Sequence, residues 1–335
     1  MLVAGVPYRS SLYDASHSGS RCRSGLATAM SSRLLDQVPR GARVIIVRLR
    51  SMGDCVLTTP ALEILKNARA DLAISIVVEE RFQAIFEGNP ALSATLDPGF
   101  STIRRWRPYL CLNLHGGRRS MLLTAASRAR IRSGFAHHRG AFLYNAPIPR
   151  AQEILGEERP IHTAEHLASA MFYLGCPVQE IPRARLFAAP PPQSTPYAIF
   201  HPIATAEYKT WPAERFVQVA EYVRRACGLE PTFIGGASDD LSAFRSFRVL
   251  AGTPLAEIKS LISGASLFFG NDSGPAHIAA AFDIPLVVLF GRMEHSITWA
   301  PWRATSAALL ASPQGIAAIS VEDAIGCVER LQIAH

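Results

Sequence analysis

The sequence predicts an α/β protein of two domains, each built around a parallel sheet. Short continuous apolar runs alternate with segments of helical spacing in both halves of the chain, as expected for strands buried on both faces and the helices that connect them. A proline-rich segment separates the two series. We therefore expect a disordered leader at 1–40, one domain at 41–187, a linker at 188–196 and a second domain at 197–335.

Composition supports a large buried core. Of 335 residues, 49% are hydrophobic and 18% charged, which excludes wholesale disorder. The six cysteines form no C-x-x-C pair, so we expect a reduced, cytosolic chain without a zinc module. The net charge of +7 favours an anionic partner: a nucleic acid, a membrane surface or a phosphorylated substrate. No apolar run approaches the length of a bilayer span.

The leader is rich in serine and arginine and lacks periodicity. Arg9, Asp14 and Arg21 interrupt any apolar core that a signal peptide would need. Organised sequence begins soon after Met30, which is an alternative start of the chain.

In the first domain, apolar runs predict strands at Val44–Val47, Ile74–Val78 and Leu110–Leu114. Helical spacing follows the first two strands, with Pro60 expected early in the first helix, and returns from His166 to Leu174. In the second domain, strands are predicted at 198–200, 232–234, 267–269 and 286–290, with helices at 216–223, 255–262 and 321–331.

The second domain is organised around Phe269–Gly291. An apolar run ends at a glycine-containing loop, helical spacing begins with Pro275 in its first turn, and a second apolar run follows. Asp272 and Ser273 can both cap the free amides of that turn. A helix N-terminus at the carboxyl end of a strand attracts anions, so we expect a phosphate site here.

Two further loops follow predicted strands. In Ser51–Asp54, Asp54 could serve as a general base, although on spacing alone an N-cap aspartate is the more common use. In Thr205–Pro212, Lys209 could neutralise a phosphate, or be a solvated surface lysine. Paired acids at Asp239 and Asp240 could bind ribose hydroxyls or cap a helix.

The pattern His162-Thr163-Ala164-Glu165-His166 matches H-x-x-E-H, a zinc-protease motif, but a helix N-terminus is the better interpretation because a further ligand is missing. Basic clusters make the first domain cationic, either as a solvated face or as a seat for a phosphorylated or lipid-anchored acceptor. They comprise Arg104, Arg105, Arg107, Arg118, Arg119, Arg128, Arg130, Arg132 and Arg139. No RNA-binding motif accompanies them.

Several motifs are absent from the sequence. It has no G-x-G-x-x-G after the first strand, no P-loop and no G-x-S-x-G elbow, which disfavours a dinucleotide enzyme, Walker-type phosphoryl transfer and a serine hydrolase. It also has no Asp-x-Asp, so we expect no divalent metal clamping a nucleotide diphosphate.

Four motifs in order give the chain a resemblance to a known family. They are Ser51–Asp54, Val77–Glu80, Lys209–Pro212 and Gly270–His277. Over residues 43–335 the chain resembles glycosyltransferase family 9, the ADP-heptose–lipopolysaccharide heptosyltransferases.

The resemblance implies a GT-B fold, with two Rossmann-like domains facing across a cleft. It implies inverting, metal-independent transfer of heptose from ADP-heptose to the inner core of lipopolysaccharide, with no cofactor. Asp54 corresponds to the general base and Lys209 to a catalytic contact with the diphosphate. The expected partners are the nucleotide sugar, a phosphorylated lipid-linked acceptor such as Kdo-lipid A, and the anionic inner membrane, but no nucleic acid. The expected location is the cytoplasm, peripheral at that membrane.

The donor residues implied by the resemblance are Thr205, Lys209, Asp240, Thr253, Asp272, Ser273, Gly274 and His277. The candidate acceptor residues are Ser51, Met52, Gly53, His115, Arg118 and Arg119. The chain departs from the family pattern at Asn113, where Asp is usual, and at Arg292, where Pro is usual.

Alternative functions are another nucleotide-sugar transferase or an epimerase of the same fold, and a non-catalytic module that binds nucleotide or phospholipid. The presence of both Asp54 and Lys209 favours an enzyme, since binding alone needs no base.

Overall fold

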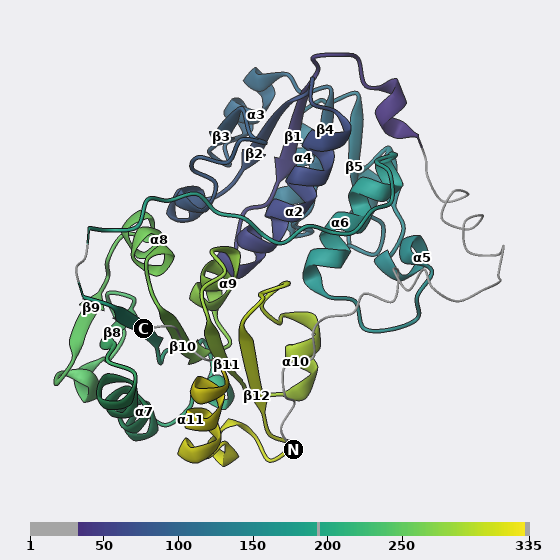
Figure 1. Cartoon of the computed structure of the whole chain (residues 1–335). Helices are drawn as coiled ribbons and strands as arrows, with labels where there is room; N and C mark the ends of the chain where they lie inside the picture. The colour runs from purple at the N-terminus through teal and green to yellow at the C-terminus, as the bar shows by residue number, and fades with distance from the viewer. Residues whose placement is uncertain (1–32, 193–194, 332–335) are drawn as a thin grey trace. The chain divides into compact units, whose positions relative to one another are not determined.

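Two six-stranded sheets, each wholly parallel, form the framework of the protein (Figure 1). The computed structural model describes residues 33–192 and 195–331. They belong to two units, which we call the N-terminal unit, ending at Pro182, and the C-terminal unit, starting at Arg183. The α/β class predicted from the alternating pattern is confirmed.

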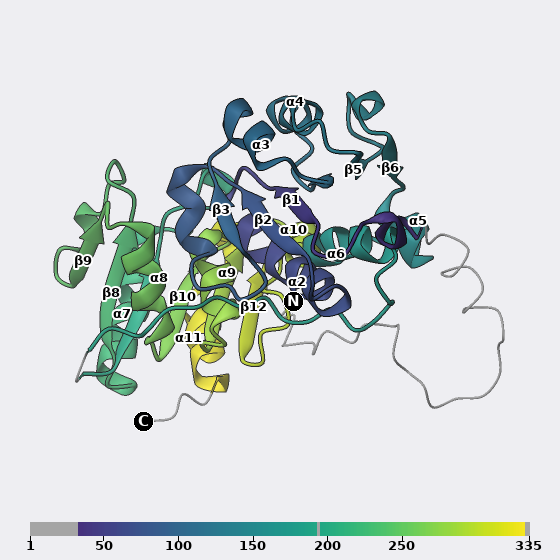
Figure 2. The same ribbon diagram turned by 90° about the horizontal axis from the view of Figure 1, so that it is seen from above.

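The N-terminal unit begins with a short 3-10 helix, η2 (Leu34–Gln37). Its strands are β1 (Arg43–Val47), β2 (Ala73–Val77), β3 (Ala94–Leu96), β4 (Leu110–Asn113), β5 (Ile131–Phe135) and β6 (Ala146–Ile148). Its helices are α2 (Met52–Ala68), α3 (Phe100–Trp106), α4 (Arg118–Ala126), α5 (Ala151–Leu155) and α6 (Thr163–Leu174), with 3-10 turns η3 (Glu80–Ile85) and η4 (Ala141–Leu143). Figure 2 shows α2 and α6 over one face of the sheet, and α3 and α4 over the other.

The C-terminal unit repeats this plan. Its strands are β7 (Tyr197–His201), β8 (Glu230–Gly235), β9 (Arg248–Ala251), β10 (Leu267–Asn271), β11 (Leu286–Phe290) and β12 (Ala307–Ala311). Its helices are α7 (Ala213–Ala226), α8 (Leu255–Ser263), α9 (Gly274–Ala281), α10 (Met293–Thr298) and α11 (Val321–Arg330), with 3-10 turns η5 (Glu207–Lys209), η6 (Ser242–Phe244) and η7 (Ile316–Ala318).

Both sheets have the same doubly wound strand order. It is β3-β2-β1-β4-β5-β6 in the N-terminal unit and β12-β11-β10-β7-β8-β9 in the C-terminal unit. In each, the first strand pairs with both the second and the fourth, so the chain reverses its winding direction between the first and fourth strands. That is the Rossmann order, and its switch points lie between β1 and β4 and between β7 and β10.

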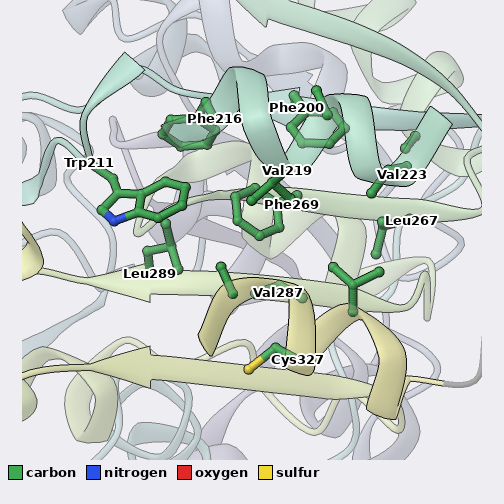
Figure 3. Packing of buried hydrophobic residues seen from close by; sticks show 14 of the residues in the cluster. Phe200, Trp211, Phe216, Val219, Val223, Leu267, Phe269, Val287, Leu289 and Cys327 are labelled. Carbon is green, nitrogen blue, oxygen red and sulfur yellow. The ribbon is translucent and has the colours of Figure 1, made fainter. Parts of the chain in front are cut away.

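An aromatic core fills the C-terminal unit (Figure 3). Phe200 of β7 lies 5.0 Å from Phe233 and 5.4 Å from Phe269, measured between ring centroids. Trp211 is fully buried, meets Phe216 edge-on, and donates its indole N–H to the carbonyl of Ile319 at 3.0 Å. The ring contact with Phe216 and the hydrogen bond to Ile319 fix the position of Trp211. The loop that carries Lys209 ends at Trp211 and is therefore anchored at that end.

The strands at the centre of each sheet were predicted correctly, but the four edge strands and β5, next to one edge, were not. The structure adds β3, β5, β6, β9 and β12, whose sequences are short, interrupted by polar residues, or only partly buried, so they lack a continuous apolar run. Pro60 lies in the interior of α2 rather than near its start, because the helix begins at Met52.

Two boundaries also differ from expectation. The predicted leader lies outside the described residues as far as position 32, but Leu35 and Val38 are buried at η2, so ordered structure begins before residue 41. The proline-rich segment, apart from the undescribed residues 193–194, is packed rather than free-standing. The carbonyl of Ala189 accepts a hydrogen bond from Ser260 Oγ at 2.6 Å, and a side chain at Gly264 would meet Pro190 at 3.0 Å.

Across the described part of the chain, no helix is both long and apolar enough to cross a membrane.

Candidate active site

Most of the predicted site residues lie at the two switch points. Loops leave neighbouring strands in opposite directions there, which opens a crevice at the carboxyl edge of the sheet. In the N-terminal unit these loops are residues 48–51 after β1 and 114–117 after β4. In the C-terminal unit they are residues 202–212, which include η5, after β7, and 272–273 after β10.

Asp54 lies in the first turn of α2, three residues beyond the N-cap Ser51. The N-cap interpretation of Asp54 is therefore wrong. Its Oδ2 accepts a hydrogen bond from Ser51 Oγ at 3.2 Å, and its Oδ1 lies 3.2 Å from Arg48 Nη2. The side chain keeps 31% of its surface exposed, so the carboxylate is both oriented and accessible.

Arg48 directly follows β1 and is only 6% exposed. Its Nη1 donates to the carbonyl of Leu114 at 2.7 Å, so one guanidinium links the ends of β1 and β4 to the carboxylate of Asp54. The sequence analysis did not select Arg48. An arginine immediately after a buried strand at a switch point is the signal that would have identified it, but the strand order was needed first.

Four histidines surround this carboxyl edge. The ring of His166 stacks on Phe135, with centroids 3.9 Å apart, and His137 and His138 are 4.2 Å apart. Burial, and then the neighbouring His137, His138 and Arg48, lower the pKa of His166 to about 4. Burial, His137, His115 and Arg48 lower the pKa of His138 to about 4. These imidazoles are therefore neutral near pH 7.

The lowered pKa of His166 predicts a loss of stability in acid. The unfolded state, with an ordinary histidine pKa near 6.5, takes up the proton first, so stability is full above that pH and falls as the pH drops toward 4. We expect the free energy of unfolding to decrease between about pH 7.5 and pH 5, and His166→Phe to remove about 1–2 kcal/mol of that decrease. Urea unfolding at both pH values measures it.

The control for this prediction is His295→Phe in the C-terminal unit, because His295 is less buried and its pKa is also lowered. This variant should keep nearly all of the acid-dependent loss. Equal effects of the two substitutions would show that His166 is not a principal source of it.

Asn113, at the end of β4, is fully buried and positions the loop that follows. Its Oδ1 accepts from the backbone amides of His115 and Gly116, and its Nδ2 donates to Ser120 Oγ at 3.1 Å and Tyr144 Oη at 2.9 Å. This departure from the family pattern thus acts on loop geometry rather than facing a ligand directly.

The other candidate acceptor residues are spread along the same edge. Met52 and Gly53 are half-buried in the first turn of α2. Arg118 and Arg119 begin α4 and are exposed, and Arg119 Nη1 lies 3.8 Å from Glu79 Oε1. Burial, Arg48 and Arg50 lower the pKa of His115.

The H-x-x-E-H segment is a helix start, as the helical interpretation predicted. His162 is the N-cap of α6, its Nδ1 accepts from the amide of Ala164 at 3.1 Å, and Glu165 Oε2 accepts from the amide of His162 at 3.0 Å. Glu165 also pairs with Arg159 at 2.7 Å. In residues 33–192 and 195–331, no group of three or more His, Cys, Asp or Glu side chains could hold a metal ion.

In the C-terminal unit, Lys209 and Asp272 form an ion pair. Lys209 Nζ lies 2.8 Å from Asp272 Oδ2, and the two side chains are only 17% and 7% exposed. Lys209 is therefore not a solvated surface lysine. The pair joins the loops after β7 and β10, the two strands at the switch point.

The first turn of α9 has no side-chain cap. Ser273 occupies the N-cap position without a capping hydrogen bond, and Asp272 is engaged by Lys209, so the capping predicted for both residues is not formed. The buried Ser273 Oγ has no hydrogen-bond partner among the described residues. A turn with uncapped amides, a partial positive charge and a hydroxyl donor suits an anion.

Asn271 fixes these loops, and the sequence analysis missed it. The side chain is fully buried, donates to the carbonyl of Pro202 at 2.7 Å and accepts from the amide of Trp211 at 3.3 Å. It thereby holds both ends of the loop that carries Lys209. The feature that could have identified Asn271 is a single polar residue at the end of an otherwise apolar strand.

The remaining donor candidates lie along the same edge. Thr205 is exposed in the loop after β7, and His277 is buried in α9. Asp240 accepts from the amide of Ser242 at 2.9 Å, which lowers its pKa. Thr253 follows β9, and β9 is separated from β10 by three strand spacings, which is about 14 Å. The structure therefore joins Lys209 to Asp272–Gly274 but places Asp240 and Thr253 farther along.

Aromatic and cationic side chains near Lys209 were not predicted. Lys209 Nζ lies 5.8 Å from the ring centroid of Trp299, which meets His295 edge-on at 5.0 Å. The guanidinium of Arg292, the second departure from the family pattern, lies 4.7 Å from the centroid of the Tyr208 ring. A side chain at Gly291 would collide with the carbonyl oxygen of Tyr208, so this close approach of the two backbones requires glycine.

Comparisons with known proteins show which family the sequence is similar to. The sequence model of glycosyltransferase family 9 (heptosyltransferase) matches residues 102–327. Lipopolysaccharide heptosyltransferase 3 of Escherichia coli is 27% identical over 295 residues, which is 76% of this chain and 84% of that protein.

Two solved structures share the fold. A family 9 glycosyl transferase from Veillonella parvula has a TM-score of 0.76 and 22% identity, covering 87% of this chain and 97% of that one. The ADP-heptose lipopolysaccharide heptosyltransferase II of E. coli has a TM-score of 0.73 and 17% identity, covering 86% and 98%. The GT-B fold is confirmed.

Proposed function

The chain belongs to glycosyltransferase family 9, and from that premise we propose that it transfers heptose from ADP-heptose to a hydroxyl of the lipopolysaccharide core, with inversion at the anomeric carbon. The observation that carries the proposal is the position of the motif residues. Asp54 lies at one switch point, and Lys209 with residues 271–274 lies at the other. The curated relative at 27% identity is a lipopolysaccharide heptosyltransferase, which supports the sugar and the acceptor class.

Asp54 is the proposed base. The attacking hydroxyl must lose its proton as the new glycosidic bond forms, and a positioned carboxylate can accept it. Ser51 Oγ and Arg48 Nη2 each hold one oxygen of Asp54, which keeps the carboxylate oriented. Arg48 itself is fixed by the carbonyl of Leu114, so it acts as a positioning residue for the base.

Lys209 and the start of α9 are proposed to hold the diphosphate. The bond from the anomeric carbon to the phosphate oxygen breaks with its electron pair on the departing ADP, so negative charge grows there in the transition state. The uncapped amides of α9, Ser273 Oγ and Lys209 form a preorganised positive field for that charge. In this proposal the positive field stabilises the charge on the departing diphosphate, a task that a divalent metal performs in other enzymes. The proposed reaction is therefore metal-independent.

Asp272 has a second role in the proposal. It holds the ammonium of Lys209 at 2.8 Å before the donor arrives, so the charge is already placed when ADP leaves. Asp240 and Thr253, farther along the edge toward β8 and β9, are proposed contacts of the adenosine.

The test is a transfer assay with the full chain, ADP-heptose and Kdo-lipid A. We expect ADP release that depends on both substrates, a product heavier by one heptose, and an anomeric configuration opposite to that of the donor. Retention of configuration would contradict the inverting mechanism. Faster turnover with another nucleotide sugar would overturn the donor assignment, and absence of transfer from any donor would favour the non-catalytic alternative.

A further inference from the structure

The proposed diphosphate site carries less positive charge than its ligand carries negative charge. The diphosphate of a nucleotide sugar has a charge of about −2, and its terminal phosphate gains up to about one further unit as the sugar departs, because the second pKa of a phosphate is about 6. On the protein side, the ammonium of Lys209 lies 2.8 Å from the carboxylate of Asp272, which offsets part of its charge. The first turn of α9 adds only about half a unit. A further cation is therefore expected near Lys209.

Arg292 is an exposed cation that approaches this site from the neighbouring strand. It follows β11 and directly precedes α10, which packs against β11 and β12 (Figure 1). Because β11 pairs in parallel with β10, the loop after β11 lies beside the loop after β10, which carries Asp272. The guanidinium of Arg292 lies over the ring of Tyr208, 4.7 Å from its centroid, and Tyr208 directly precedes Lys209 in η5. Two cations thus reach one edge of the sheet from different loops.

A close backbone contact holds these two loops together. A side chain at Gly291 would collide with the carbonyl oxygen of Tyr208, so the chain on either side of this contact is kept in place. His295 of α10 senses both cations: burial is the first cause of its lowered pKa, and Lys209 and Arg292 lower that pKa further. Arg292 and Lys209 therefore belong to one electrostatic neighbourhood.

Aromatic faces hold both cations without cancelling their charge. Tyr208 is 44% exposed and Trp299 37% exposed, and Lys209 Nζ lies 5.8 Å from the centroid of the Trp299 ring. A ring quadrupole orients a guanidinium or an ammonium but leaves its unit charge intact, whereas a carboxylate neutralises it. Within residues 33–192 and 195–331, Arg292 forms no salt bridge. Its charge is available to a ligand.

We propose that Arg292, held over the face of Tyr208, is a second cation for the departing diphosphate. This inference rests on the proposed function and deepens it. The bond from the anomeric carbon to the phosphate oxygen breaks with its electron pair on ADP, and the guanidinium meets the charge that grows there. Its planar fork can donate two parallel N–H bonds to phosphate oxygens, and it stays charged at any working pH. Tyr208 is a positioning residue, because it acts through Arg292.

Two other uses of Arg292 fit the observations less well. A structural ion pair with Glu294, which is also exposed and lies two residues further on, is not formed. Binding of an uncharged sugar hydroxyl would need only a hydrogen-bond donor, and it would not require a full charge held over the residue next to Lys209.

The test is calorimetric titration of the full chain with ADP and with inorganic pyrophosphate. Arg292→Gln should raise the Kd for both by about tenfold or more, the usual effect of losing one hydrogen bond to a charged group. Arg292→Lys keeps the charge but loses the fork, so its Kd values should lie between those of the parent chain and Arg292→Gln. The control is Arg225→Gln, which removes an exposed arginine from the last turn of α7 in the same unit and should bind like the parent chain.

Transfer activity separates a catalytic role from a structural one. Arg292→Ala should lower kcat by about 10²-fold, the lower end for removal of one donor from an oxyanion hole, and added guanidinium ion should restore part of the loss. Tyr208→Leu removes the ring under the guanidinium and should also lower kcat, whereas Tyr208→Phe keeps the ring and should recover it. The melting temperature of the Arg292 variants should stay that of the parent chain, because the side chain is exposed.

Equal affinities of Arg292→Gln and Arg225→Gln for both ligands would overturn the proposal, even if transfer by the parent chain established the proposed function. A loss of affinity confined to ADP-heptose would also overturn it and would assign Arg292 to the sugar. If the parent chain bound pyrophosphate through Arg292 but did not bind ADP, the nucleotide of the proposed function would be wrong while the diphosphate subsite stood. Failure of the inference is thus distinguishable from failure of the proposed function.

Discussion

Asp54→Asn should lower kcat for heptose transfer by about 10²–10⁴-fold, the usual contribution of a positioned general base. The amide keeps the shape of the side chain and can still accept a hydrogen bond from Ser51 Oγ, but it cannot take up the proton of the acceptor. Because Asp54 belongs to the N-terminal unit and the proposed diphosphate contacts belong to the C-terminal unit, the KM for the donor should change little. Steady-state ADP release and calorimetric titration with ADP measure the two effects.

The control for this variant is Asp97→Asn. Asp97 is also a carboxylate of the N-terminal unit, and it accepts a hydrogen bond from Gln83 Nε2 at 2.7 Å. Its substitution removes the same charge and should change kcat by less than about twofold, as for surface substitutions generally. If Asp54→Asn retained near-parental kcat, or if it lost donor affinity as strongly as kcat, the assignment of the base would be wrong.

The central strands could be predicted because the burial of each one leaves a continuous apolar run in its own short segment of sequence. Runs such as Val44–Val47 and Leu286–Phe290 are apolar throughout, since a central parallel strand is buried on both faces. The edge strand β6 has only three residues, with the exposed Pro147 at its centre, and β9 is only partly buried, so neither shows such a run. The strand order, which places the switch points, depends on pairing between distant segments and could not be read from any one of them.

The candidate site was predictable only where it is carried by loop motifs. Asp54, Lys209 and Asp272 lie in motifs that follow strands, and the sequence predicts all three as site residues. It does not predict the ion pair between Lys209 and Asp272. Arg48 and Asn271 were missed because their importance comes from what their side chains reach: the carbonyl of Leu114 in one case and that of Pro202 in the other. Such contacts join residues more than sixty positions apart.

Lys209→Met should lower kcat by about 10²–10³-fold, comparable to the removal of one donor from an oxyanion hole. Methionine retains most of the apolar stem but removes the charge proposed to meet the leaving diphosphate. The exposed Arg245→Met is the control, since it removes a cation from the same unit away from the switch point, and it should leave kcat nearly unchanged. ADP release under saturating donor measures both variants.

The ion pair with Asp272 offers a sharper test of what Lys209 does. If Lys209 served only to neutralise Asp272, then Lys209→Met/Asp272→Asn, which removes both charges, should recover activity because no buried charge is left unpaired. If Lys209 stabilises the leaving group, the double variant should regain thermal stability relative to Lys209→Met yet remain about as slow. We expect this second outcome, since the uncapped first turn of α9 supplies only part of the positive field and the ammonium supplies the full charge. Recovery of kcat together with stability would leave the helix terminus, Ser273 and Arg292 as the only proposed contacts of the diphosphate.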